Sequence, residues 1–118
     1  MKVIHYYMVP KSPGTYLGHD HLMDIARRHG AQVQPRPFAL AERVFQVSGG
    51  LPLPKRSPQR QAYRLVELRR WSEYRNVPLT LHPRYFPVDD AAACRMIIMA
   101  AQTQGDQAAN RLAGAFLR

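Results

Sequence analysis

The pattern of hydrophobic and polar positions predicts a strand, a helix and a second strand within the first 40 residues. KVIHYYMV, residues 2–9, is rich in β-branched and aromatic residues and precedes a proline, which favours a strand. In SPGTYLGHDHLMDIARRHG, apolar residues recur at helical spacing, Ser12 and Pro13 suit the helix start, and Gly30 suits its end. The alternating AQVQPRPFAL contains two prolines, which indicates an edge strand or an extended segment. We therefore expect a βαβ unit with parallel strands and a right-handed crossover.

The pattern becomes helical after residue 40. LAERVFQVSGG predicts a short helix ended by Gly49 and Gly50, and LPLPKRSP predicts an irregular loop. Ser57-Pro58 repeats the signal of a capping serine before a proline, and it begins the longer helix QRQAYRLVELRRWSEYRN. We interpret Trp71 as core packing on the broad apolar stripe of this helix. The stripe consists of Ala62, Leu65, Leu68, Trp71 and Tyr74.

Two further helices are predicted near the end of the sequence. AAACRMIIMAAQTQG follows an N-cap at Asp89 or Asp90 and is apolar nearly all round, which is typical of a buried helix. Cys94 within it is interpreted as a small buried hydrophobe. QAANRLAGAFLR starts after Asp106, and its apolar face continues to the end at Arg118. Because this helix stops in mid-stripe and two strands alone are marginal, we expect the natural protein to continue beyond residue 118.

Composition and charge narrow the class of protein. The hydrophobic content of 46% argues against disorder, and no run of about 20 apolar residues exists to form a transmembrane helix. The N-terminal segment is a poor secretory signal and the sequence has a single cysteine, so we expect a cytoplasmic protein. Seventeen Lys and Arg against eight Asp and Glu give a net charge of +9. This charge is compatible with a solvated surface, anionic small ligands or nucleic acid, although the arginines are scattered without a base-stacking aromatic signature.

The order of several short motifs resembles one family. The tetrad region SPGTYLG after the first strand resembles the start of 2-hydroxychromene-2-carboxylate isomerases and of the related kappa-class glutathione transferases. RRHGAQV, FQVSGGLPLP, RRWSEYRNVPL, HPRYFPV and RLAGAFLR are similar to later segments of that family, in the same order. The resemblance implies an α/β, thioredoxin-like fold. Residues 1–40 are then its N-terminal βαβ portion and residues 41–118 a truncated helical insertion domain, with the second half of the sheet missing.

The resemblance gives Ser12 a specific role. Redox members of this fold have Cys-x-x-Cys at the tetrad, whereas Ser12 and Thr15 carry hydroxyls here, which excludes disulfide exchange at this site. A helix N-terminus favours an anion, and in the family a serine hydroxyl at this place hydrogen-bonds the sulfur of bound glutathione. We therefore expect glutathione as the cofactor, held at Ser12 and Pro13, with Ser12 as the catalytic residue that stabilises its thiolate.

The substrate that the resemblance implies is an aromatic carboxylate. By position, Arg43, Lys55 and Tyr85 match the substrate-contacting residues of the family, and Tyr85 aligns without ambiguity. The implied reaction is a glutathione-dependent cis–trans isomerisation of the 2-hydroxychromene-2-carboxylate type, which belongs to the degradation of aromatic compounds.

Other interpretations of the sequence stay open. The chain could be a non-catalytic, dimerising relic of the fold that pairs through exposed faces at Ile97, Ile98 and Phe116, or a basic protein that binds nucleic acid. A homodimer is expected in the main interpretation as well. His19 and His21 flank Asp20 in a pattern typical of metal sites, but residues two apart point to nearly opposite sides of a helix, so we expect no metal there.

Overall fold

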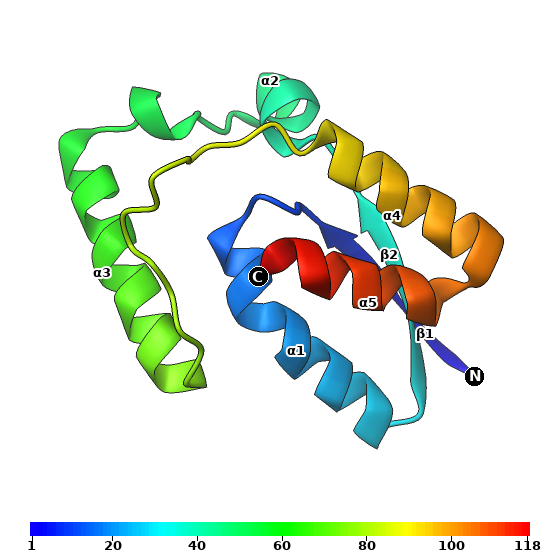
Figure 1. Ribbon diagram of the computed structural model, residues 1–118. Helices are drawn as coiled ribbons and strands as arrows, with labels where there is room; N and C mark the ends of the chain where they lie inside the picture. The colour runs from blue at the N-terminus through cyan, green and yellow to red at the C-terminus, as the bar shows by residue number, and fades with distance from the viewer. The chain divides into compact units, whose positions relative to one another are not determined.

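The first three elements form the predicted βαβ unit. A computed structural model describes residues 1–118 (Figure 1). Strand β1 (Lys2–Met8), helix α1 (Pro13–Arg28) and strand β2 (Ala31–Pro37) follow one another, and the strands pair in parallel with Lys2 opposite Ala31 and Met8 opposite Pro37. They make a two-stranded sheet. The predicted parallel βαβ unit is therefore confirmed.

Helix α1 begins and ends at the residues that the sequence indicates. Ser12 is its N-cap, Oγ accepts a hydrogen bond from the Thr15 backbone N–H at 3.3 Å, and Pro13 occupies the first helical position, where a missing N–H costs nothing. Gly30 has φ 59°, in the left-handed region that ends helices and favours glycine. The helix is thus delimited by local chemistry at both ends.

Residues 39–86 form a second compact unit made of short helices and loops. It contains a π-helical turn η1 (Leu40–Val44), helix α2 (Phe45–Ser48), a 3-10 turn η2 (Leu53–Lys55) and helix α3 (Pro58–Arg75). Gly49 has φ 78° and ends α2 as predicted. Ser57 caps α3 by accepting the Arg60 N–H at 3.3 Å, as predicted.

The chain then returns to the first unit, which consists of residues 1–38 and 87–118. Helices α4 (Ala91–Gln104) and α5 (Asp106–Leu117) pack on each other and on β2 (Figure 1). The contact pattern divides the chain at residues 38 and 86. The predicted domain boundary at residue 40 stays a prediction. In α5 the small side chains of Ala109 and Ala113 are both fully buried and lie one turn apart, on the side of the helix that packs into the core of this unit.

The core of the first unit lies between β1, α4 and α5. Met8, Ile97, Ala109 and Ala113 form its buried cluster. In α4 only Ile97 is buried, so the prediction of a helix buried all round is wrong; it is a one-sided helix, and Cys94 is only half-buried. Ile97 is also wrongly placed among the exposed residues of a dimer contact, because none of its surface is accessible. Ile98 and Phe116 are exposed, and a homodimer stays a prediction.

Helix α3 has no buried residue, which corrects the predicted core role of Trp71. Trp71 is 45% exposed and packs edge-on against Tyr74, which lies on the same helix. Apolar residues spaced strictly by three advance 300° per step, so each lies 60° away from the last around the helix axis. The apparent stripe therefore winds round the helix, and its last members face solvent. No helix in the structure is both long and apolar enough to cross a membrane.

Candidate functional site

Ser12 lies at the junction between β1 and α1, with its side chain half-buried. Its backbone N–H donates to the Val9 carbonyl at 3.0 Å, and its carbonyl accepts from the Tyr16 N–H at 3.1 Å. Because both backbone groups are bonded, the turn holds the residue in a defined position. Oγ accepts from the Thr15 N–H, and a hydroxyl that accepts through oxygen can still donate its own proton.

Gly14 leaves room beside the Ser12 hydroxyl. A Cβ added at Gly14 would lie 3.5 Å from Ser12 Oγ, in ordinary van der Waals contact. Gly14 itself is exposed. A residue with a side chain at this position would therefore cover part of the hydroxyl, whereas glycine keeps that side of it open.

An ion pair is anchored one residue before Ser12. The Lys11 backbone N–H donates to Asp90 Oδ2 at 3.3 Å, and Lys11 Nζ lies 4.0 Å from Asp90 Oδ1. The two side chains are only 16% and 9% exposed. Asp90 precedes α4, so this contact ties the start of that helix to the turn that presents Ser12.

The five predicted site residues fall in both units. Ser12 and Pro13 belong to the first unit, at the start of α1, and the predicted helix-terminal position of Ser12 is what the structure contains. The predicted substrate-contacting residues occupy three separate segments of the second unit: Arg43 in η1, Lys55 in η2 and Tyr85 in the loop after α3. Tyr85 is 73% exposed, with the Arg84 guanidinium 5.4 Å from its ring centre. The roles of Arg43, Lys55 and Tyr85 stay predictions.

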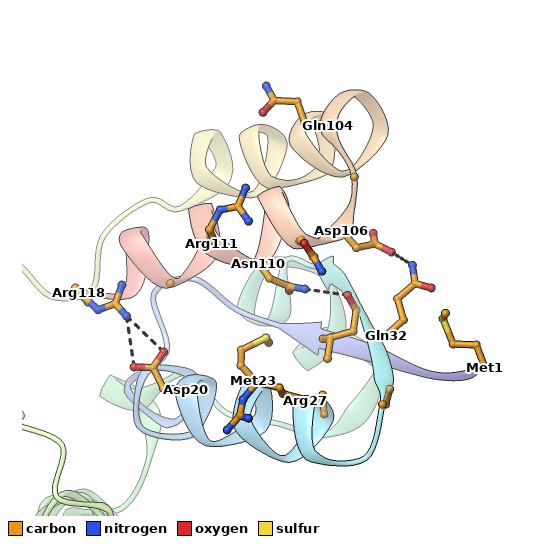
Figure 2. A pocket seen from close by; sticks show the side chains of 17 residues that line it. Met1, Asp20, Met23, Arg27, Gln32, Gln104, Asp106, Asn110, Arg111 and Arg118 are labelled. Carbon is orange, nitrogen blue, oxygen red and sulfur yellow. Dashed lines mark hydrogen bonds and ion pairs between the residues drawn. The ribbon is translucent and has the colours of Figure 1, made fainter.

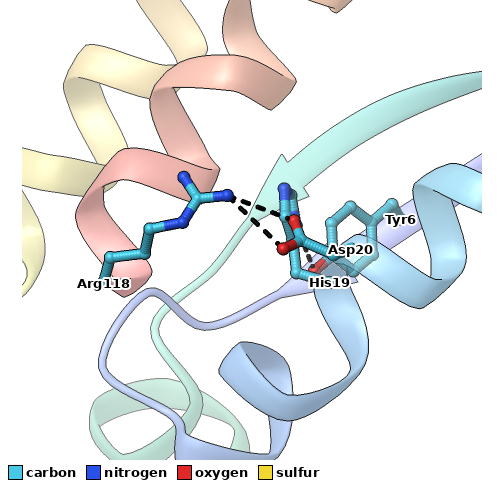
Figure 3. Close-up of polar contacts among 4 residues, drawn as sticks. All are labelled: Tyr6, His19, Asp20 and Arg118. Carbon is cyan, nitrogen blue, oxygen red and sulfur yellow. Dashed lines mark hydrogen bonds and ion pairs between the residues drawn. The ribbon is translucent and has the colours of Figure 1, made fainter. Parts of the chain in front are cut away.

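A polar cluster around the buried His19 joins β1, α1 and the end of α5 (Figure 3). The hydroxyl of Tyr6 and Nδ1 of His19 are hydrogen-bonded at 3.0 Å, and His19 is 4% exposed. Asp20 and Arg118 form an exposed ion pair at 3.4 Å beside them. Helix α5 approaches His19 at Gly114, where an added Cβ would lie 3.1 Å from Nε2. His19 therefore holds α1 against its two neighbours.

Burial sets the protonation of this cluster. It lowers the pKa of His19 from its ordinary value of 6.5, an effect that the nearby Asp20 carboxylate partly opposes. Burial, together with Asp20, raises the pKa of Tyr6 to about 12. Apart from the His-Asp-His pattern, no local motif indicates this cluster, because the residues that contact His19 lie at least 13 positions away in the sequence. No group of three or more His, Cys, Asp or Glu side chains in residues 1–118 could hold a metal ion.

A groove of about 1010 Å³ runs between α1, β2 and α5 (Figure 2). Asn110 lines it and donates from Nδ2 to the Val33 carbonyl at 2.9 Å, while Gln32 donates from Nε2 to Asp106 at 2.7 Å. Asn110 is 8% exposed and its Oδ1 meets no hydrogen-bond donor of the chain. The two amide contacts hold α5 against β2.

Comparison with known proteins identifies the family. The sequence matches the DSBA-like thioredoxin domain over residues 4–118. The chain belongs to the DSBA-like thioredoxin domain family. This DSBA-like chain is also similar to a solved structure of 2-hydroxychromene-2-carboxylate isomerase (HCCA isomerase), with a TM-score of 0.69 and 22% sequence identity. The similarity covers 96% of this chain and 53% of that one, so the DSBA-like chain spans about half the length of the isomerase chain. A search of curated protein sequences gave no match.

These comparisons decide the fold of the DSBA-like chain. The thioredoxin-like fold expected from the motif order is confirmed, as is the presence of only part of it, with a two-stranded sheet and surrounding helices. At 22% identity the similarity to the isomerase concerns the fold alone.

Proposed function

We propose that this chain supplies the thiolate-binding part of a glutathione-dependent cis–trans isomerase of the 2-hydroxychromene-2-carboxylate type, which acts in the degradation of aromatic compounds. The observation that carries the proposal is the half-buried Ser12 hydroxyl at the N-terminus of α1. Membership of a thioredoxin-like family supports it. In redox members of this fold the reactive Cys-x-x-Cys lies at the start of the first helix, at the positions that Ser12 to Thr15 occupy here.

The residues around Ser12 fit the sulfur of glutathione. The start of α1 carries roughly half a positive elementary charge, and its N–H groups favour an anion. Pro13 has no N–H to offer, so Gly14 supplies the next backbone donor of the first turn. Ser12 Oγ accepts from Thr15, which orients the hydroxyl and leaves its proton to be donated to an anionic sulfur. Ser12 is thus a stabiliser of a thiolate and not itself a nucleophile.

The chemistry divides between cofactor and protein. Bound glutathione would supply a thiolate whose reversible addition to a conjugated double bond permits rotation about that bond. Ser12 holds the sulfur in its ionised form, because a hydrogen bond to the charged form favours it. Arg43 and Lys55 offer cations, and Tyr85 a hydroxyl, for the carboxylate of an aromatic substrate.

Glutathione binding tests the proposal directly. Hydrogen bonds to charged groups contribute about 1.5–3 kcal/mol, so Ser12→Ala should weaken glutathione binding by about tenfold or more in titration calorimetry at a pH where the thiol is ionised. Ser57→Ala is the matched control, because Ser57 caps α3 with the same geometry, also before a proline. Ser57→Ala should leave the affinity unchanged. Equal affinities in wild type and Ser12→Ala would remove the assigned role.

Turnover tests the reaction itself. With 2-hydroxychromene-2-carboxylate as substrate, isomerisation should depend on added glutathione and should fall at least about tenfold in Ser12→Ala. Full turnover without glutathione, or unchanged turnover in Ser12→Ala, would contradict the mechanism.

Binding of single-stranded nucleic acid is a second candidate function. The favouring observation is that arginines of the second unit do have aromatic neighbours: Arg75 lies 5.5 Å from the Trp71 ring centre and 5.3 Å from that of Tyr74, and both rings are exposed. Exposed aromatics beside cations are the surfaces on which unpaired bases stack. The test is single-stranded DNA affinity against salt concentration: a steep decrease that Trp71→Ala removes and Ser12→Ala does not would favour this function.

A further inference from the structure

We propose that the Lys11–Asp90 ion pair places two opposing charges beside the Ser12 site, with Lys11 strengthening its affinity for an anion and Asp90 weakening it. The inference rests on the proposed function of Ser12, and it concerns the control of the same site. Its basis is the buried pair one residue away, which connects the turn before α1 to the start of α4.

Asp90 is directed to this turn although it stands at a helix start. Asp90 is the N-cap residue of α4, yet its side chain makes no capping bond. The neighbouring Asp89 takes that role, because its Oδ1 accepts the Ala91 N–H at 3.0 Å. The Asp90 carboxylate instead accepts the Lys11 N–H, 79 residues earlier in the sequence. Two adjacent aspartates thus have different roles: Asp89 caps the start of α4, and Asp90 places a charge beside the Ser12 turn.

Because the two side chains are largely buried, their charges are only weakly screened by water. Asp90 is 8% exposed, and burying a charge without a partner is costly, so the carboxylate and the Lys11 ammonium depend on each other. Charges shielded from water act on their surroundings more strongly than exposed ones. While both are present, their effects on a nearby anion largely cancel. Removal of either one leaves a net charge next to Ser12.

A double-mutant cycle measures this effect. The probes are glutathione sulfonate, which has a fixed negative charge at the sulfur position, and S-methylglutathione, which is neutral there. Lys11→Met should weaken binding of the sulfonate about fivefold and Asp90→Asn should strengthen it about fivefold, the order of magnitude expected for one nearby charge that is partly screened by solvent. The double variant should return to the wild-type affinity, and S-methylglutathione should bind all four proteins alike.

The outcomes separate this inference from the proposed function. If glutathione sulfonate fails to bind the wild type, or binds Ser12→Ala as tightly, both the proposed function and this inference are overturned. If Ser12→Ala weakens binding but the two single variants move in the same direction, or change both probes equally, only the role of the ion pair is overturned. Asp90→Asn preserves the shape and the acceptor for the Lys11 N–H, so its result alone decides the sign if Lys11→Met does not fold.

Discussion

The two units of this chain use the same local signals but differ in what they bury. Every fully buried hydrophobic residue belongs to the first unit, whereas the second unit has no residue in that class. Both units nevertheless contain a serine that caps a helix before a proline, with the same 3.3 Å bond at Ser12 and at Ser57. Local capping therefore decides where a helix starts, and burial decides which helix is held in place.

The two units also differ in how firmly they hold the residues of the proposed site. In the first unit the site residue Ser12 stands on a helix that is held at its middle by His19 and Leu17, both buried. In the second unit the proposed substrate residues lie on turns and loops and are themselves exposed. A rigid element can hold a thiolate in one position, whereas surface loops carry specificity and vary more easily.

The largest expected effect tests the core of the first unit. Ile97→Ala should lower the free energy of unfolding by about 2–5 kcal/mol, because the side chain is fully buried and its loss leaves a cavity. Ile98→Ala on the same helix is the matched control: Ile98 is 41% exposed, so the loss should stay below about 1 kcal/mol. Urea unfolding followed by circular dichroism measures both, and equal losses would show that α4 is not packed as described.

The joint between α4 and α5 should give the next largest effect. Gly105 has φ 93° and ψ 169°, a conformation that residues with a side chain rarely adopt, so Gly105→Ala should cost about 1–3 kcal/mol. Gly18→Ala should instead stabilise α1 by up to about 1 kcal/mol, since a Cβ there meets nothing within 4 Å and alanine favours helix. Opposite shifts of the melting temperature are expected, and a neutral Gly105→Ala would exclude strain at the joint.

Features set by neighbouring residues were predictable from the sequence. The Ser-Pro starts of α1 and α3 and the glycine ends at Gly30 and Gly49 all follow from chemistry within one turn of backbone. The same holds for the parallel βαβ unit, because a strand, a crossover helix and a second strand in one sheet almost always form a parallel pair with a right-handed connection. The tetrad position of Ser12 at a helix start belongs to this class of prediction.

Features set by distant residues were not predictable. The return of α4 and α5 to the sheet depends on contacts between segments far apart in the sequence, such as Asn110 with Val33, which are 77 residues apart. The apolar pattern of α4 does not indicate which side of the helix faces the core, so it does not distinguish the buried Ile97 from the exposed Ile98. The role of His19 was not predictable for the same reason, because it depends on Tyr6 and on α5, and neither is close to His19 in sequence.

The pH dependence of stability should show a smaller effect that is confined to the first unit. Burial lowers the pKa of His19 in the folded state. As the pH falls below about 6.5, the unfolded chain therefore takes up a proton before the folded chain does, and the free energy of unfolding decreases. The slope for one proton is at most about 1.4 kcal/mol per pH unit. His19→Gln should remove this part of the slope, whereas His82→Gln, at an exposed residue of the second unit, should not. An unchanged slope in His19→Gln would contradict a neutral buried imidazole.

The smallest expected effect compares the two serine caps. Replacing either Ser12 or Ser57 by alanine removes one capping hydrogen bond, which typically costs about 1 kcal/mol of helix stability. In α1 that cost should lower the free energy of unfolding of the whole first unit, because buried residues of α1 pack in the interior of that unit. In α3, which buries nothing, the cost should remain local.

Hydrogen exchange read by NMR distinguishes the two cases. Ser57→Ala should raise the exchange rates of amides in the first turns of α3 and leave those of β1 and α5 unchanged. Ser12→Ala should raise the rates of the slowest amides in β1, α1 and α5 together, by about fivefold for a loss of 1 kcal/mol. If Ser57→Ala also speeds exchange in β1, then α3 contributes to the stability of the sheet, and the contrast between a cohesive unit and a locally stabilised one does not hold.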